Sequence, residues 1–105
     1  MSIFQGAMGE ELERNLRKQD SFRNELQSLP KGYLSTCRIE GVDYIYRKHR
    51  DGKKIVSVYI GLPGNKEVLK AIQDREAYLL AKRSLSDLRL EEKRLRKAIK
   101  EYTKR

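Results

Sequence analysis

The fold is decided between residues 33 and 60, where the sequence reads YLSTCRIEGVDYIYRKHRDGKKIVSVYI. Three segments in this stretch alternate in side-chain character: Tyr33 to Ile39, Val42 to Arg50 and Lys54 to Ile60. They are rich in Tyr, Ile, Val, Thr and Ser, as strands are. Glu40-Gly41 and Asp51-Gly52 separate them, and Asp-Gly is among the strongest short signals for a hairpin. The stretch therefore predicts a three-stranded antiparallel meander.

The segments on both sides of the meander favour helices. Residues 10–29 place apolar side chains on one face of a 3.6-residue repeat, and Pro30 ends the pattern. Residues 65–103 contain no Gly or Pro and are rich in strong helix formers, with Asn65 as the N-cap. The composition favours one continuous helix. The alternative is a break into two helices near Ser84–Ser86, where a Ser could cap a new helix. The fold class is α+β.

The first nine residues are set apart from this fold. Residues 4–9 read FQGAMG, which resembles a protease-site scar followed by vector residues, and such tags do not bear on the fold. The alternative is a natural disordered tail, since disorder concentrates at termini. We expect residues 10–105 to form a single domain.

Two-residue turns would fix which side chains share a face of the sheet. With Glu40-Gly41 and Asp51-Gly52 as the turns, Cys37 faces Tyr44 and Tyr46 faces Ser57. One face, here named the tyrosine face, then holds eight apolar or aromatic side chains: Tyr33, Cys37, Ile39, Val42, Tyr44, Tyr46, Ile55 and Tyr59. The opposite face, here named the mixed face, holds five apolar side chains among polar and charged ones: Leu34, Ile45, Val56, Val58 and Ile60, with Thr36, Arg38, Asp43, Arg47, His49 and Lys54. This count predicts that the tyrosine face packs on a helix and that the mixed face is exposed.

Composition limits the classes of function. The formal net charge is +9, from 24 basic and 15 acidic residues, so an anionic partner is favoured. One Cys and one His exclude an intramolecular disulfide and most zinc sites. No apolar run reaches the roughly 20 residues of a membrane span, and no secretory signal is present. We expect a cytoplasmic protein without metal or cofactor, and the absence of any catalytic motif predicts that it is not an enzyme.

Basic residues concentrate around the second hairpin. Residues 31–66 carry eight basic and three acidic side chains, and six of the eight residues from Arg47 to Lys54 are Lys, Arg or His. A two-stranded ribbon fits the DNA major groove, and cations on it can neutralise phosphates. The candidate nucleic-acid-binding residues are Arg38, Arg47, Lys48, His49, Arg50, Lys53 and Lys54.

The C-terminal helix carries an apolar seam with alternating spacings of three and four. It runs through Tyr78, Ala81, Leu85, Leu88, Glu92, Leu95, Ile99 and Tyr102, with Glu92 as its one polar position. Such a seam is typical of a coiled coil. It predicts packing either against the N-terminal helix of the same chain or against a second chain in a homodimer.

Four short segments carry a resemblance to known families. Residues 29–33, 41–46, 50–54 and 57–61 contain Pro30-Lys31-Gly32, Tyr44-Ile45-Tyr46, Asp51-Gly52-Lys53 and Ser57-Val58-Tyr59-Ile60-Gly61. This pattern resembles small uncharacterised proteins of bacteria and their mobile elements, which join such a strand region to a long charged helix. More distantly, it is similar to the arm-type DNA-binding domain of phage integrases. That resemblance implies DNA contact through Arg47, Arg50, Lys53 and Lys54, although the N-terminal helix and the length of the final helix depart from the integrase pattern.

Two classes of function follow. The favoured one is a non-enzymatic nucleic-acid-binding accessory protein, with DNA preferred over RNA, of phage or mobile-element type. The alternative is a protein-interaction module, a small inhibitor or adaptor, that docks a partner through its long helix. An acidic protein surface is the other partner that the positive charge of the chain favours.

Overall fold

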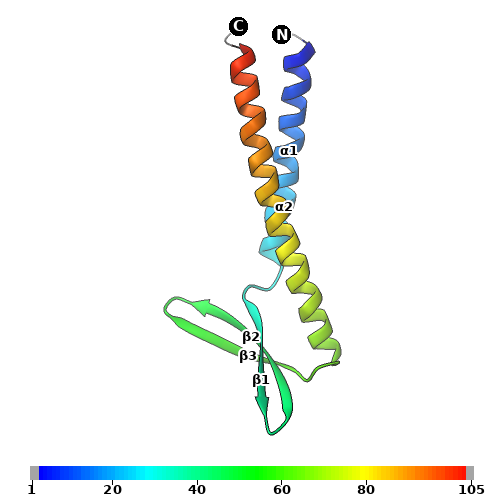
Figure 1. Cartoon of the computed structure of the whole chain (residues 1–105), viewed down its shortest axis with the longest axis vertical. Coiled ribbons are helices and arrows are strands. Elements are labelled where there is room, and N and C mark those ends of the chain that lie inside the picture. Colours follow the sequence, from blue (N-terminus) through cyan, green and yellow to red (C-terminus); the bar gives the residue numbers. More distant parts are fainter. Residues whose placement is uncertain (1–2, 104–105) are drawn as a thin grey trace. The chain divides into compact units, whose positions relative to one another are not determined.

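The computed structural model describes residues 3–103 and shows two helices and three strands (Figure 1). The α+β prediction is confirmed, with the elements in the expected order. They are α1 (Ile3–Ser28), β1 (Tyr33–Ile39), β2 (Val42–Asp51), β3 (Lys54–Gly61) and α2 (Lys66–Thr103).

The chain divides into two compact units. The helical unit holds α1 and the part of α2 from Leu80 onward, whereas the sheet unit holds Leu29–Leu79, with the three strands and the first part of α2. The long helix α2 therefore contributes to both units.

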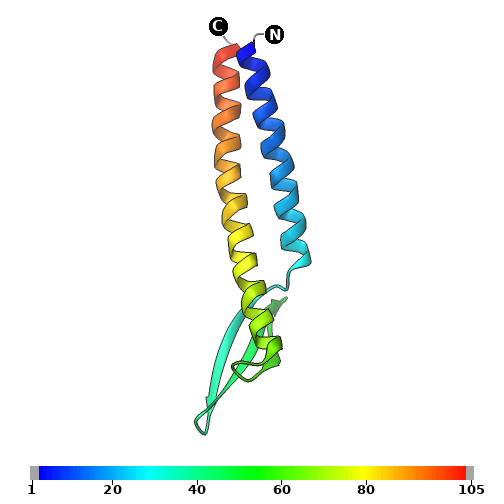
Figure 2. The same ribbon diagram turned by 90° about the vertical axis from the view of Figure 1, so that its right-hand side faces the viewer.

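In the helical unit, α1 lies alongside α2 in the opposite direction (Figures 1 and 2). Met8, Ala81 and Leu85 are buried there, and Leu12, Leu16 and other apolar residues at helical spacing are half-buried. Most of the stability of a helix comes from packing its apolar face, so this contact accounts for the length of α1.

The start of α1 corrects the expected boundary at Glu10. The helix begins at Ile3, so residues 3–9 are helical rather than a disordered tail. Two glycines, Gly6 and Gly9, disfavour helix by roughly 1 kcal/mol each, but Met8 between them is buried. Packing therefore overrides the local preference.

The helix α2 is continuous from Lys66 to Thr103, so the alternative of a break near Ser84–Ser86 is wrong. Its N-terminus is capped as expected, because the Asn65 Oδ1 accepts a hydrogen bond of 3.0 Å from the backbone N–H of Glu67. Half-buried Ser84 and buried Leu85 lie within the helix contact region. Tertiary packing thus favours one helix over a second start at Ser84.

The sheet has the strand order β1-β2-β3, and all pairs are antiparallel. In the first hairpin, Ile39 pairs with Val42 and Cys37 with Tyr44, as predicted. Glu40 and Gly41 have φ of 49° and 80°. Positive φ at both central residues is the signature of a type I′ turn, whose twist matches that of the strands.

The second hairpin turns one residue later than predicted. Asp51 pairs with Lys54, so the turn residues are Gly52-Lys53 rather than Asp51-Gly52. Gly52 has φ of 63°, and Lys53 does not have positive φ, which fits a type II′ turn with Gly first. The pairing consequently shifts by two residues, and Tyr46 faces Tyr59 instead of Ser57. A two-residue shift preserves the faces of the strands.

The first part of α2 meets the sheet near Leu34 and Arg47 of the mixed face. Val68 and Ala71 are buried, and Ala71 lines a small cleft together with Leu34 and Arg47 of that face. A register irregularity between Ile45 and Tyr46 marks a bulge in the facing β3, which is how sheets redirect a strand end. The predicted core face is therefore wrong, because five large apolar side chains of the tyrosine face are exposed, whereas α2 meets the sheet at Leu34 and Arg47 of the mixed face.

Arg75 of α2 also joins the helix to the chain that enters β1. Its Nη1 donates a hydrogen bond of 2.5 Å to the Gly32 carbonyl oxygen, and its guanidinium lies 5.4 Å from the ring centroid of Tyr78. Such charge-assisted contacts are roughly twice as strong as neutral ones. The hydrogen bond ties the first part of α2 to the chain segment that enters β1.

Candidate nucleic-acid interface

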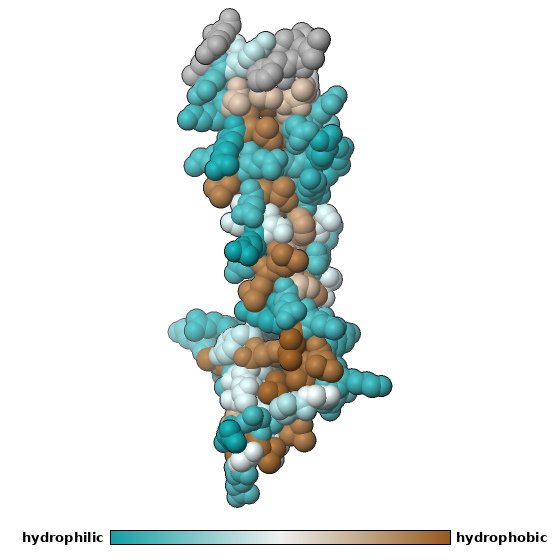
Figure 3. All heavy atoms as spheres, turned by 45° about the vertical axis from the view of Figure 1, so that its right-hand side comes forward, coloured by the Kyte–Doolittle hydropathy of each residue, from teal (hydrophilic) through white to brown (hydrophobic). Residues whose placement is uncertain are grey.

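Most of the apolar side chains on the tyrosine face are exposed. Five of its members are exposed large hydrophobic residues: Tyr33, Ile39, Val42, Ile55 and Tyr59 have exposed fractions of 48%, 51%, 40%, 60% and 50%. Tyr44 and Tyr46 are half-buried in the central strand. Figure 3 shows one side of the molecule, on which hydrophobic residues lie at the surface in the region of the sheet unit. Exposed apolar patches mark interaction sites.

Three tyrosines of this face form one cluster across β2 and β3. The ring centroid of Tyr59 lies 5.4 Å from that of Tyr46 and 6.1 Å from that of Tyr44, with tilts of 59° and 52°. Tilted rings at this separation stabilise each other. Tyr59 therefore has two aromatic neighbours and is still half-exposed.

Cations lie beside the tyrosines on the same face. Lys48 pairs with Tyr33 on one side and with Ser57 on the other, and Arg50 pairs with Ile55. Residues that pair directly project to the same side of a sheet. The two cations therefore stand at the end of the tyrosine face that leads to the β2–β3 turn.

The acidic side chains of the strands lie on the other side. Asp43 pairs with Arg38 and Asp51 with Lys54, so both carboxylates belong to the mixed face by their register. The tyrosine face consequently combines aromatic rings, hydroxyl groups and two cations without a carboxylate among its strand residues. This is the charge pattern that an anionic ligand needs.

The predicted nucleic-acid-binding residues are not all on one surface. Arg50, Lys53 and Lys54 are exposed around the turn. Arg47 and His49 are half-buried on the mixed face, where Arg47 lines a cleft with Ala71 and Asp74 of α2. Lys48 is half-buried on the tyrosine face.

Arg38 is exposed, and its Nε lies 3.9 Å from the Asp43 carboxylate across the first hairpin. An exposed pair of this kind contributes little to stability. The partner nevertheless lowers the local positive charge, so Arg38 is a weaker candidate for phosphate contact than the residues of the second hairpin.

The predicted helix seam is divided between the two units. In the helical unit, Leu85 is buried and Leu88, Leu95 and Ile99 are half-buried, whereas Tyr102 is 37% exposed. Tyr78 belongs to the sheet unit, where it contacts Arg75. The seam from Ala81 onward packs against α1 of the same chain, which is one of the two predicted arrangements. A coiled coil in a homodimer stays a prediction.

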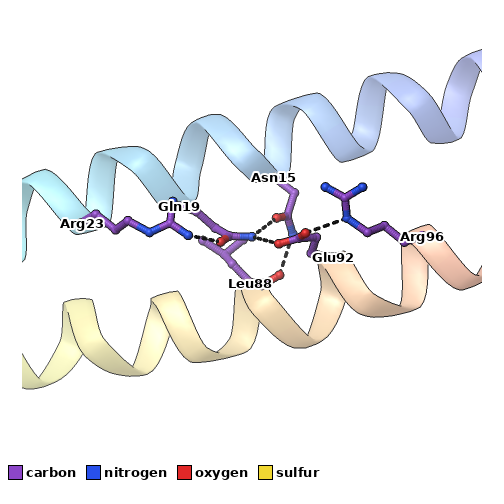
Figure 4. A network of polar contacts seen from close by, with 6 residues as sticks. All are labelled: Asn15, Gln19, Arg23, Leu88, Glu92 and Arg96. Atoms are coloured by element: carbon purple, nitrogen blue, oxygen red, sulfur yellow. Dashed lines mark hydrogen bonds and ion pairs between the residues drawn. The ribbon is translucent and has the colours of Figure 1, made fainter.

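A polar layer that sequence reasoning missed lies within the helical unit (Figure 4). Asn15 and Gln19 are buried, with exposed fractions of 2% and 0%. The Gln19 Nε2 donates to the Asn15 Oδ1 at 2.7 Å and to the Glu92 Oε1 at 2.8 Å, and the Asn15 Nδ2 donates to the Leu88 carbonyl oxygen at 2.9 Å. Burial of these amides is tolerated because their hydrogen bonds are satisfied.

The signal for this layer was present in the sequence. Met8, Leu12, Asn15, Gln19, Phe22 and Leu26 follow alternating spacings of four and three. When only apolar positions are counted, Asn15 and Gln19 are left out and the alternating spacing is lost. Including them gives a regular seam on α1 that matches the seam on α2.

Glu92 is the charged member of the layer. Its Oε2 accepts a hydrogen bond of 2.7 Å from the Arg96 Nε, and the Gln19 amide and Arg96 together hold the pKa of the Glu92 carboxyl below its ordinary value. Hydrogen bonds to the ionised form favour that form. The carboxylate therefore stays ionised as the acceptor that orients Gln19.

Neither a metal site, a membrane span nor similarity to a known protein assigns a function to the described part of the chain. Within residues 3–103, no group of three or more His, Cys, Asp and Glu side chains is placed to hold a metal ion. In the same range, neither helix is both long enough and apolar enough to cross a membrane. No family model, curated protein or solved structure matches the chain.

Proposed function

We propose that this chain is a non-enzymatic nucleic-acid-binding protein that contacts its ligand through the sheet unit. The observation that supports this function is the group of exposed cations Arg50, Lys53 and Lys54 beside an uncovered face without carboxylates. Neutralised phosphates supply most of the affinity in non-specific nucleic-acid binding. An accessory role on cytoplasmic DNA, of the phage or mobile-element type, belongs to the same proposal.

The cations of α2 are the natural comparison. Lys93, Lys97 and Lys100 are also exposed, but Glu91, Glu92 and Glu101 lie among them in the sequence. Arg96 donates to Glu92 rather than projecting alone. We therefore expect the field of the hairpin to contribute more to binding than the field of the C-terminal helix.

Two charge-matched triple variants test the function. One replaces Arg50, Lys53 and Lys54 by Gln, and the other replaces Lys93, Lys97 and Lys100 by Gln. Each is titrated against random-sequence DNA at several salt concentrations. Each lost phosphate contact should reduce the slope of log K against log salt by roughly 0.7 to 0.9. We expect the hairpin variant to lose the larger part of the slope.

The titrations show which surface contacts DNA and whether the protein binds DNA at all. If the hairpin variant binds like the parent and the helix variant loses affinity, the sheet is not the contact surface. If the parent protein binds DNA no more tightly than it binds an uncharged polymer, the proposed nucleic-acid-binding function is wrong. The positive charge then serves another purpose.

The protein-interaction alternative has one specific observation behind it. Leu80 and Leu90 in the helical unit have exposed fractions of 64% and 54%, and helical geometry turns them away from buried Leu85. A partner helix or a second copy of the chain could cover them. Sedimentation equilibrium of the parent and of a Leu80→Glu, Leu90→Glu variant tests self-association, and a monomeric parent would remove the homodimer.

A further inference from the structure

We propose that the tyrosine face binds single-stranded nucleic acid, with unstacked bases on the exposed tyrosine rings and phosphates at Lys48 and Arg50. The proposal deepens the nucleic-acid-binding function above and rests on it. It names the form of the ligand, and it assigns the contact to the flat face of the sheet rather than to the tip of a hairpin in a groove.

The rings are placed as a platform. Tyr33 on β1 and Tyr59 on β3 are 48% and 50% exposed, and the central strand between them carries Tyr46, which contacts Tyr59. Strand spacing makes this platform roughly 10 Å wide. Sheets that present exposed aromatic side chains in this way bind bases by stacking, which tolerates any base because each has a π-face.

The cations complete the platform. In the register, Tyr33, Lys48 and Ser57 form one row across the sheet, Ser35, Tyr46 and Tyr59 form the next, and Arg50 and Ile55 form the row on the other side. Rows on one face are separated by about 7 Å. Positive charge therefore lies directly beside the rings, where the backbone of a stacked strand would pass.

A duplex cannot use this surface in the same way. Its bases are stacked on one another and show only their edges in the grooves. The major groove admits a two-stranded ribbon, whereas the tyrosine face spans three strands. The rings of Tyr33 and Tyr59 gain contact area only from bases that have left a stack.

A second copy of the chain is a poorer occupant of the face. Two tyrosine faces packed together would bury Lys48 and Arg50 of each copy in the interface, without a carboxylate among the strand residues of either face to compensate. Like charges in a desolvated interface oppose association. Charge complementarity therefore favours an anionic ligand.

The test compares three probes with the same anisotropy assay. The probes are a fluorescent oligothymidylate, a duplex of equal charge and a poly-glutamate peptide. The variants are Tyr33→Ala, Tyr59→Ala, Tyr33→Phe and, as a control on the opposite face, Val58→Ala, a residue that is 46% exposed. Circular dichroism confirms that each variant is folded.

We expect tighter binding of the single strand than of the duplex. Each Tyr→Ala change should weaken single-strand binding roughly 5- to 150-fold, which corresponds to the loss of one stacked base. Tyr33→Phe keeps the ring and should bind like the parent, as should Val58→Ala.

The failures are distinguishable. If the duplex binds as tightly as the single strand and the Tyr→Ala variants match the parent, the stacking proposal is wrong but the nucleic-acid-binding function stands. If poly-glutamate binds as tightly as the oligonucleotide, charge alone is responsible and an acidic protein surface becomes the ligand. If no nucleic-acid probe binds, the function and this proposal fail together.

Discussion

The helical unit and the sheet unit place their polar groups in opposite ways. In the helical unit, two amides and one carboxylate lie in the contact between α1 and α2, and within residues 3–103 every buried side-chain nitrogen and oxygen has a hydrogen-bond partner. In the sheet unit, large apolar and aromatic side chains stand exposed on the tyrosine face. The helical unit thus buries polar groups between its helices, whereas the sheet unit exposes aromatic and apolar groups together on one face.

The difference shows what each unit depends on. A buried polar layer is costly unless all its members are paired, so it favours one alignment of the two helices over others. The sheet unit instead depends on backbone pairing and on glycines at its turns, which leaves the tyrosine face available to a ligand. Function is therefore expected where packing is incomplete.

The largest loss of stability should come from Gly32→Ala, and it should be confined to the sheet unit. Gly32 has φ of 106°, and an added Cβ would overlap the Lys48 carbonyl oxygen and lie 2.9 Å from the His49 Cβ. Strained φ costs of order 1–3 kcal/mol, and the overlap adds to it, so we expect a loss of at least about 3 kcal/mol. Hydrogen exchange should report lower protection in β1 and β2 and unchanged protection in α1.

Gly52→Ala is the matched control for that change. Gly52 also has positive φ, of 63°, but an added Cβ meets no atom within 4 Å. We expect a loss of roughly 1–2 kcal/mol, the cost of the positive φ alone. Equal losses for the two variants would show that close backbone packing at Gly32 is unimportant.

Gln19→Ala should produce the next largest effect, now in the helical unit. The change removes the donor to both Asn15 and Glu92 and leaves a buried acceptor without its partner. We expect a loss of about 2 kcal/mol in the free energy of unfolding. Gln27→Ala on the exposed side of α1 should change stability by less than about 0.5 kcal/mol. Chemical denaturation measures both, and a harmless Gln19→Ala would contradict the role of the polar layer.

The effect of pH on the stability of the helical unit should be smaller than the effect of Gln19→Ala. Its sign follows from the direction in which the pKa of Glu92 is shifted. The pKa of Glu92 is lowered in the folded chain, first by the Gln19 hydrogen bond and then by Arg96. Its contribution to stability is therefore complete above the ordinary value of 4.5 and is lost as pH falls through the lowered pKa. The difference in stability between the parent and Glu92→Gln should shrink over that acidic window. A constant difference from neutral to acidic pH would contradict this assignment.

The smallest effect should be a gain at the first hairpin. Glu40 adopts φ of 49° in the turn, a region that Asn tolerates better than Glu. Glu40→Asn should stabilise the sheet unit by roughly 0.5 kcal/mol because the native φ becomes less costly. Thermal unfolding monitored in the strands measures the gain. No change or a loss would mean that Glu40 makes a compensating contribution.

Much of the fold could be predicted from local patterns. Alternation and the Glu40-Gly41 turn gave the strands and the first register, and the absence of Gly and Pro gave α2. The second turn was placed one residue early because Asp51-Gly52 suits a type I′ turn, whereas the chain places Gly52 first in the turn and keeps Asp51 in β2.

The uncovered face could not be predicted by counting apolar residues. The tyrosine face has more of them, yet Tyr33, Ile55 and Tyr59 remain exposed. The first part of α2 buries only the small side chains Val68 and Ala71, which need few apolar partners on the sheet. The side to which α2 returns after Gly61 is a property of the connection and not of the composition.

Thiol reactivity of Cys37 tests the uncovered tyrosine face most directly. Cys37 is the single cysteine, lies on this face opposite Tyr44 and is exposed. In the folded protein, dithiobis(nitrobenzoic acid) should modify it at a rate within about tenfold of the rate in the denatured chain, because opening of the fold is not needed for access. Modification only at the rate of unfolding, with strong protection in the native protein, would show that the tyrosine face is covered and would contradict the account.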